Sequence, residues 1–199
     1  YGSTFFMNTY DLIQDMTFSQ ARDWTAGAKL TYHVKDWFSV TGSLHADFYD
    51  RFKRHERIDT RNKDYESSIW QPRLTITSNY FDGHSLIFGV EHTSDELTSD
   101  RFSGNANHDL KTRALKETEY FLQDEWTINP KWMVSAGLRT NFSKAFGFMG
   151  MPKIAAKYSP NERWSIRANY SMGYRSPSIK ELFFNWDHLG MFMIRGNEN

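Results

Sequence analysis

Hydrophobic and polar side chains alternate along most of this chain with a period of two residues. From Trp24 to Val34, every second residue is aromatic or aliphatic, and the residues between them are polar or glycine. The same alternation returns at 38–48, 70–80 and 132–142 and again at 164–174. A period of two is typical of β-strands with one apolar face, whereas a helix would show a period of 3.6 residues.

The alternation predicts an all-β protein with about eight strands. The connections between them are of two kinds: tight turns with Asp-Gly, Asn-Pro or Ser-Pro pairs, and long polar stretches. Short turns at one end and long loops at the other describe antiparallel, up-and-down strands. We predict strands near 16–34, 37–52, 66–80, 84–98, 113–128, 131–145, 150–159 and 163–176, with part of another strand within 1–14.

Alternation alone fits a soluble β-sandwich or adhesin-like binding module, whose apolar face is a core, and an outer-membrane barrel, whose apolar face meets lipid. The predicted strands are much longer than the 5 or 6 residues usual in soluble proteins. Charged residues such as Lys29, Arg73 and Arg139 lie at mid-strand on the polar face, which suits a watery lumen. Aromatic residues beside the short turns resemble the girdle at a membrane–water interface. These aromatics are Trp37, Tyr80, Phe81, Trp126, Trp132, Tyr158 and Trp164.

The barrel is therefore the favoured interpretation, although two residues disturb the apolar face. Asp124 falls among Tyr120, Leu122 and Trp126, and we expect its cost to be small because a tight turn is near. Pro72 falls inside a strand, where it removes a ladder donor, and a bulge is the expected accommodation.

Composition narrows the function. The 199 residues are 17% aromatic with a mean hydropathy of −0.67, an unusual pairing for a soluble domain. The net charge of zero argues against a nucleic-acid partner, and the absence of cysteine excludes disulfides and Cys-based metal sites. No apolar run approaches the roughly 18 to 20 residues of a membrane-spanning helix. No nucleophile, zinc or phosphate-binding motif is present, so we do not expect an enzyme.

The C-terminal third carries the most specific motifs. The stretch "MPKIAAKYSPNERWSIRANYSMGYRSPSIKELFF", followed by "IRGNEN", resembles the barrel of TonB-dependent outer-membrane receptors, and "LQDEW" (122–126) and "AGLR" (136–139) resemble two more of its strand signatures. The resemblance implies a 22-stranded transmembrane barrel with a plug domain in its lumen. About eight strands cannot close such a barrel, and both ends of the chain look cut. We therefore expect 1–199 to be a partial barrel that lacks the plug, with 177–199 starting a long extracellular loop.

The resemblance also implies location and partners. The protein would lie in the bacterial outer membrane, contact its lipid, and import a scarce nutrient such as an iron complex, haem or cobalamin. Energy would come from the inner-membrane TonB complex through the missing plug, and a surface lipoprotein is a possible further partner. No cofactor of its own is implied.

The candidate ligand-binding residues are Tyr174, Arg175, His188 and Met191, which lie between or beside the "YRSP" and "GNEN" motifs. In haem receptors of similar sequence, a histidine between these motifs is an axial haem ligand, and imidazole binds haem iron well. The alternative for His188 is a loop histidine packed against Phe184 and Trp186. For Arg175, pairing with a carboxylate such as Glu181 is the alternative to ligand contact.

Overall fold

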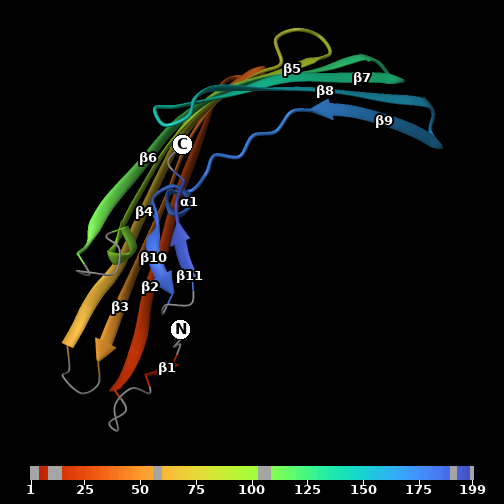
Figure 1. Ribbon diagram of the computed structural model, residues 1–199. Helices are drawn as coiled ribbons and strands as arrows, with labels where there is room; N and C mark the ends of the chain where they lie inside the picture. Colours follow the sequence, from red (N-terminus) through yellow and green to blue (C-terminus); the bar gives the residue numbers. More distant parts are fainter. Residues whose placement is uncertain (1–4, 9–14, 56–59, 103–108, 189–191, 198–199) are drawn as a thin grey trace.

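The computed structural model describes residues 5–8, 15–55, 60–102, 109–188 and 192–197. Nine antiparallel strands form one sheet in which each strand pairs with its neighbours in chain order (Figure 1). The strands are β1 (Phe5–Asn8), β2 (Asp15–Lys35), β3 (Phe38–His55), β4 (Thr60–Ser78), β5 (His84–Ser99), β6 (Lys111–Asn129), β7 (Trp132–Ser143), β8 (Gly147–Asn161) and β9 (Trp164–Ser171).

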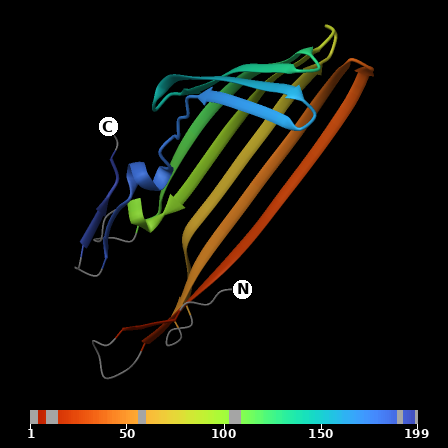
Figure 2. The same cartoon turned by 90° about the vertical axis from the view of Figure 1, so that its right-hand side faces the viewer.

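The eight predicted strands correspond to β2–β9, and β1 lies within the segment where part of another was expected. The sheet is strongly curved and stays open, with β1 and β9 at its edges (Figures 1 and 2). This is the arrangement of a segment of a barrel wall. No helix in the described ranges is both long and apolar enough to cross a membrane.

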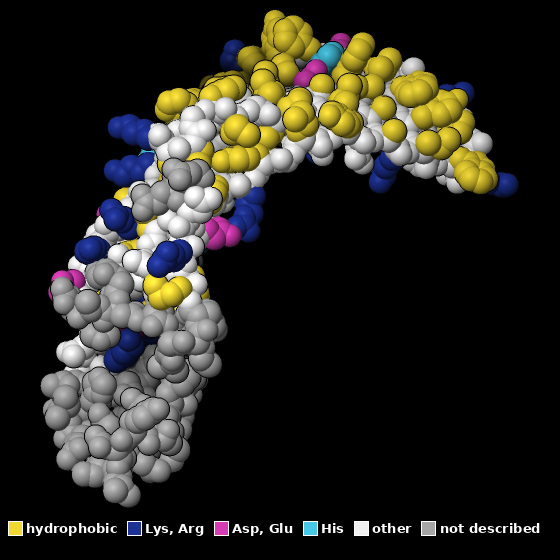
Figure 3. Space-filling view, in the orientation of Figure 1, with side chains coloured by type: hydrophobic (Ala, Val, Ile, Leu, Met, Phe, Trp, Pro, Cys, Tyr) yellow, Lys and Arg dark blue, Asp and Glu magenta, His cyan; other side chains and the backbone are white. Residues whose placement is uncertain are grey.

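The two faces of the sheet differ in chemistry, as the alternation predicted. Hydrophobic side chains gather on the convex face at the top of the view, while Lys and Arg side chains project from the concave side and also from the left-hand part of the molecule (Figure 3). On the convex face, Leu30 is 77% exposed and Trp164 is 67% exposed. No second sheet covers this face within the described part of the chain. The β-sandwich alternative is therefore excluded, because its apolar face would be a buried core.

The short turns are built by side chains that bind the backbone. Asn129 Oδ1 accepts hydrogen bonds from the backbone N–H groups of Lys131 and Trp132, at 2.9 and 3.0 Å. Asn161 Oδ1 does the same for Arg163 and Trp164, at 3.0 and 3.1 Å. An asparagine three residues before a tryptophan therefore forms both turns and begins the next strand with that tryptophan.

The turn before β5 depends instead on the backbone of Gly83. Its φ of +75° is left-handed, and a Cβ there would lie 2.7 Å from the carbonyl oxygen of Thr127. The Gly83 carbonyl also accepts a hydrogen bond of 2.7 Å from the Thr127 N–H. Only glycine fits a left-handed position this close to the neighbouring strand.

The expected bulge at Pro72 is wrong. Pairing between β4 and β5 lapses at 71–72, but the register is the same on both sides of the gap. The gap is bridged by a side-chain hydrogen bond of 3.3 Å from Gln71 to Thr93. The bulge of this region lies elsewhere, between Arg51 and Phe52 of β3, where β4 contributes one extra residue.

The segment after β9 folds back instead of forming an irregular loop. It contains helix α1 (Ile179–Phe183) and a hairpin of β10 (Asn185–His188) and β11 (Phe192–Arg195). Together these elements lie on the concave side of the sheet (Figure 1). A short 3₁₀ helix, η1 (Asp100–Phe102), follows β5 and contacts β10.

Candidate functional site

The aromatic residues predicted beside the short turns lie at that end of the strands, and several of them form ring contacts with one another. Trp37 and Tyr80 have ring centroids 4.9 Å apart, and Tyr80 and Phe81 are 5.1 Å apart. Further along, Trp132 stacks on Tyr158 at 4.4 Å. These rings are partly or largely exposed. The structure therefore gathers most of the predicted band at one end of the strands.

A second aromatic band, which the sequence analysis did not predict, lies towards the opposite ends of the strands. Trp24 stacks on Phe48 with centroids 4.2 Å apart, and Phe48 meets Trp70 edge-on at 5.3 Å. Towards the same ends of β7 and β8, Phe142 and Phe148 are opposite each other on this convex face, and both are exposed. The alternation pattern already contained this signal, since all of these residues fall on its apolar positions.

The spacing between the two bands repeats from strand to strand. Ten residues separate Phe38 from Phe48 in β3, Trp132 from Phe142 in β7, and Phe148 from Tyr158 in β8. Ten residues of strand rise roughly 33 Å, which at a tilt of about 40° spans about 25 Å. This is the height of the apolar band of a membrane barrel between its two aromatic girdles.

Asp124, which lies among apolar residues of the convex face, has a partner there. Its Oδ2 lies 2.8 Å from Nδ1 of His84, whose ring stacks on Trp126 with centroids 5.2 Å apart. The position beside a turn was the predicted reason why the charge of Asp124 is tolerated on the apolar face, and the contact with His84 adds a second reason. The other carboxylate oxygen, Oδ1, is buried without a hydrogen-bond partner among the described residues.

The concave face is polar at mid-strand and pairs its charges across neighbouring strands. Arg73 of β4 binds Glu91 of β5, and Arg139 of β7 binds Glu119 of β6. Such a face is compatible with a water-filled lumen. Within the described ranges, no three His, Asp or Glu side chains gather as a metal site, so the concave face holds no candidate metal centre there.

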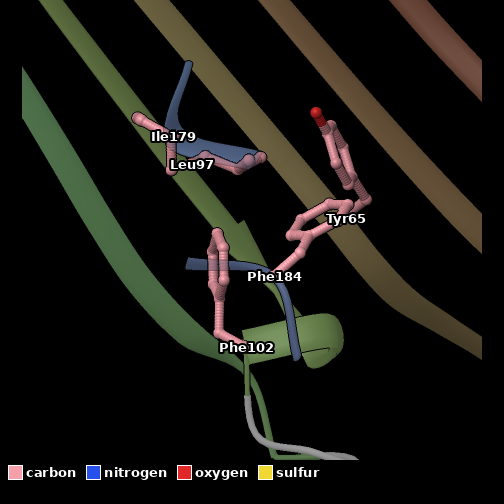
Figure 4. Close-up of a cluster of buried hydrophobic side chains, with 5 residues drawn as sticks. All are labelled: Tyr65, Leu97, Phe102, Ile179 and Phe184. Atoms are coloured by element: carbon pink, nitrogen blue, oxygen red, sulfur yellow. The ribbon is translucent and has the colours of Figure 1, made fainter. Parts of the chain in front are cut away.

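At the end of the sheet opposite the short turns, α1 packs on the concave face. Ile179 of α1 is 1% exposed and clusters with Tyr65, Leu97, Phe102 and Phe184 (Figure 4). The cluster joins β4 and β5 to the returning segment, because Tyr65 and Leu97 come from those strands. Burial of these side chains fixes the returning segment against the wall.

Helix α1 begins with a complete capping box. The Ser178 side chain accepts from the backbone N–H of Glu181, and the Glu181 carboxylate accepts from the backbone N–H of Ser178 at 2.8 Å. Glu181 also forms an ion pair with Arg175, which confirms the predicted pairing. The backbone hydrogen bond from Ser178, followed by the hydrogen bond from Arg175, lowers the pKa of Glu181 to about 2.

Beside α1 lies a cationic network. Arg51 binds Asp64 with both ends of its guanidinium group, Nε to Oδ1 at 3.1 Å and Nη2 to Oδ2 at 2.8 Å. Lys53 bridges Asp64 and Asp100 at 3.1 and 3.5 Å. Burial disfavours the charged form of Arg51, but the bonds to Asp64 outweigh burial and raise its pKa.

Arg101 of η1 differs from its neighbours because it forms no ion pair within the described residues. Its guanidinium carbon lies 4.2 Å from the ring centroid of Trp186 and 5.9 Å from that of Phe184. Burial lowers the pKa of Arg101, and the positive charge of Arg51 lowers it further. A half-buried cation between aromatic rings is suited to bind an anionic, partly aromatic molecule.

The predicted ligand residues are only partly assembled. Tyr174 and Arg175 lie in the extended segment between β9 and α1, with Tyr174 half-buried and Arg175 exposed. The backbone of His188 pairs with Phe192 at the end of the β10–β11 hairpin, and its side chain lies outside the described residues, as does all of Met191. The sequence analysis did not predict Arg101 or Arg51, because neither residue lies in a recognisable sequence motif.

Comparison with known proteins gives consistent results. A family model described as "TonB dependent receptor-like, beta-barrel" matches residues 2–199. The chain is 23% identical over 171 residues to the iron-regulated outer membrane virulence protein of Vibrio cholerae, which covers 83% of this chain and 24% of that protein. The chain therefore spans about a quarter of the length of that relative.

Two solved structures from Pseudomonas aeruginosa share the fold. A mutant of the ferric enterobactin receptor PfeA matches with a TM-score of 0.69 and 14% identity, over 92% of this chain and 30% of that one. The siderophore receptor PirA matches with a TM-score of 0.55 and 14% identity, over 94% of this chain and 42% of that one. At this level of identity the likeness establishes the fold alone.

Proposed function

Because this chain belongs to the TonB-dependent receptor β-barrel family and to the bacterial outer membrane, we propose that it forms part of the wall and mouth of a receptor that imports an iron complex. The convex face would meet lipid between the two aromatic bands, and the concave face would line the lumen. The names of the relatives support iron as the cargo: one is iron-regulated, one is a ferric enterobactin receptor and one a siderophore receptor. Family and neighbours are transport receptors, which agrees with the expectation that the chain is no enzyme.

One observation carries the choice of an anionic ferric chelate. Arg101 has no carboxylate partner in the described part of the chain, lies over the ring of Trp186, and is next to the Arg51 network on the concave side of the mouth. Siderophore complexes with aromatic, negatively charged donor groups would be attracted by the guanidinium group and would stack on the half-buried ring of Trp186. Tyr174, a few residues before α1, would extend the same surface.

The test uses the full-length receptor in a strain that lacks it. Wild type is expected to restore growth on ferric enterobactin, or on a ferric hydroxamate if catecholates are not recognised, as the sole iron source. Arg101→Ala should weaken binding about tenfold, because one charge-assisted contact is lost. Arg163→Ala, in a short turn at the other end of the strands, is the matched control and should bind as wild type does. Failure of the wild-type receptor to bind any ferric siderophore would refute the proposal.

Haem and cobalamin are the alternative cargoes within the same class of receptor. Substitution of His188 tests haem, and binding of cyanocobalamin tests cobalamin. If haem is the cargo, His188→Ala in the full-length receptor should weaken haem binding and shift the Soret band, since an axial ligand is lost. An unchanged spectrum would remove His188 as a ligand. Tight binding of cyanocobalamin with no binding of haem or ferric siderophores would reassign the cargo.

The proposed transport requires partners outside this chain. Energy would come from the inner-membrane TonB complex, acting through a plug domain, and a surface lipoprotein could deliver the cargo. Loss of uptake in a strain without TonB, with surface binding retained, is the result expected if the receptor is energised in this way.

A further inference from the structure

Three basic side chains on the concave face of β8 and β9 have no acidic partner. They are Lys153 and Lys157 of β8 and Arg167 of β9. None of the three forms an ion pair among the residues that the structure describes, and Lys157 lies directly opposite Arg167. The strands β7, β8 and β9 contain no Asp or Glu that could neutralise them. We call these three residues the basic wall.

Acidic residues near the basic wall do not balance its charge. Glu119 of β6 binds Arg139, the cation of β7, and is therefore already paired. Glu125 of β6 faces the same side of the sheet, but β7 lies between it and β8. Glu162 lies in the turn between β8 and β9. Within the described ranges no ion pair joins Glu125 or Glu162 to the basic wall, so its positive charge is uncompensated there.

The side chains between and beside these cations are small. On the concave face, Ala155 lies between the two lysines of β8, and it has Ser135 of β7 and Asn169 of β9 directly opposite on its two sides. Gly137 of β7 lies opposite Lys153. This part of the wall therefore carries no bulky side chain next to its cations, which leaves room for a large solute beside them.

A cavity of about 300 Å³ lies at the end of the basic wall that is nearer the mouth. Its lining includes the cationic side chains of Arg73, Arg139 and Lys153 and the apolar side chains of Phe121 and Met151. Each of the two arginines binds a glutamate of a neighbouring strand, so Lys153 supplies the net positive charge. A cation beside an aromatic ring suits an anionic molecule that has aromatic or apolar parts.

The basic wall begins well below the mouth and continues towards the short turns. Across β7, Lys153 is level with Gln123 of β6, eight residues beyond Leu115, which packs against the buried cluster at α1. Eight residues of strand rise roughly 26 Å. Lys157 lies four residues further towards the turns. The basic wall is therefore distinct from Arg101 at the mouth and lies along the route that a cargo would follow through the lumen.

We propose that Lys153, Lys157 and Arg167 guide a negatively charged ferric chelate through the lumen, between this wall and the plug domain. The inference rests on the proposed function and adds residues that act after the cargo has left the mouth. A cleft lined by charges of one sign raises the local concentration of an oppositely charged solute and the rate at which it arrives. An anion between Lys157 and Arg167 also relieves the repulsion of these two opposed charges.

The test compares binding with uptake by the full-length receptor, in cells with and without TonB. The probe is ferric enterobactin with radioactive iron, a chelate of net negative charge. K153Q/K157Q/R167Q removes the three charges, and K153R/K157R/R167K keeps them while changing side-chain shape. K153Q has a matched control in K29Q, which removes an exposed lysine from the concave face of β2. Thermal unfolding and heat-dependent mobility on gels report the stability of each barrel.

Binding to cells without TonB is expected to be equal in wild type and all variants, because Arg101 at the mouth is unchanged. In cells with TonB, K153Q/K157Q/R167Q should import the saturating probe about tenfold more slowly than wild type, which is the lower end of the effect of charged clefts on rates. K153R/K157R/R167K should import at the wild-type rate. Neither triple variant should unfold more easily than wild type, since K153Q/K157Q/R167Q relieves a repulsion.

The single variants decide the question if the triple variants do not fold. K153Q should slow uptake about twofold, because three equal contributions multiply to about tenfold. K29Q, on the far side of the described sheet, should import as wild type does. Equal uptake by K153Q and wild type, or an equal loss in K153Q and K29Q, would contradict a role of this particular wall.

Four further outcomes count against the inference. Wild-type uptake by K153Q/K157Q/R167Q with binding intact would overturn it and leave the proposed function standing. Equally slow uptake by K153R/K157R/R167K would show that side-chain shape matters rather than charge. A marked loss of thermal stability in K153Q/K157Q/R167Q would show that the wall holds an acidic part of the plug instead of a passing cargo. A wild-type receptor that neither binds nor imports a negatively charged ferric chelate would refute the choice of cargo in the proposed function, and this inference with it.

Discussion

Single residues on the concave face show how closely strands and side chains are matched. Phe121 of β6 lies directly across from Gly89 of β5, and a Cβ at Gly89 would collide with its ring and lie 2.8 Å from the carbonyl oxygen of Leu74. The glycine therefore lets the ring lie across the neighbouring strand, where Arg73 approaches its centroid to 5.9 Å. A glycine inside a strand here marks close approach of a side chain rather than a turn.

At the same scale, Glu181 makes the stability of the returning segment depend on pH. Its pKa is about 2 in the folded protein, below the ordinary value of 4.5, because Ser178 and Arg175 bind the carboxylate. A lowered folded pKa means that this stabilisation is complete above about pH 4.5 and is lost as the pH falls towards 2. We therefore expect amide hydrogen exchange in α1, corrected for intrinsic rates, to lose protection between about pH 5 and 2.5 in the full-length receptor.

The control for this prediction is E181Q, which cannot change charge. Its protection should be lower than that of wild type at pH 5 and nearly independent of pH below that value. Equal protection of wild-type α1 at both ends of the range would contradict the role given to Glu181.

At the scale of elements, the concave side of β7–β9 differs from that of β4–β6. The strands β4–β6 carry acids that bind Arg73 and Arg139, whereas β7, β8 and β9 contain no Asp or Glu at all. Lys157 of β8 lies directly opposite Arg167 of β9, and neither forms an ion pair among the residues that the structure describes. Two like charges in opposed positions weaken the pairing of β8 with β9.

This like-charge pair predicts a stabilising substitution. Lys157→Glu should create an opposite-charge pair with Arg167 and raise the free energy of unfolding by about 0.5–1 kcal/mol. Lys157→Gln, which removes the repulsion without adding attraction, should give a smaller gain. Thermal or denaturant unfolding of the full-length receptor measures both. A loss of stability in Lys157→Glu would instead show that this wall faces an anionic group in the intact barrel.

For the whole molecule, the dominant feature is an open, curved sheet with an exposed apolar face. The described strands leave β1 and β9 as edges whose backbone groups can pair with another chain. Large hydrophobic side chains cover the convex face, which in the outer membrane is the lipid-facing surface. Burial is concentrated at the mouth, around Ile179 and Leu97, rather than in a central core.

The 199 residues alone are accordingly expected to require detergent. In aqueous buffer the apolar face and the two edges should drive association. Light scattering coupled to size-exclusion chromatography, with and without detergent, measures this directly. A monodisperse, detergent-free monomer that unfolds cooperatively would contradict the assignment of the convex face to lipid.

Local sequence patterns were sufficient to predict much of this architecture. A period of two depends only on adjacent residues, so the sequence predicted the strands, their two faces and the aromatic residues at the short turns. The Arg175–Glu181 pair could also be predicted, because the two residues are only six apart in sequence and Glu181 lies in the first turn of the short helix α1. The bulge could not be predicted, because it is a mismatch between two strands that no single strand reveals.

Tertiary structure alone decided which side chains meet across the sheet. The phase shift in β4 sends Asp64 inward and Lys63 outward, contrary to strict alternation. The return of α1 to the concave face brings Trp186 to Arg101, although the four strands β6–β9 separate the two residues in sequence. Both contacts depend on register and on the path of the chain in space, which side-chain periodicity along the sequence does not encode.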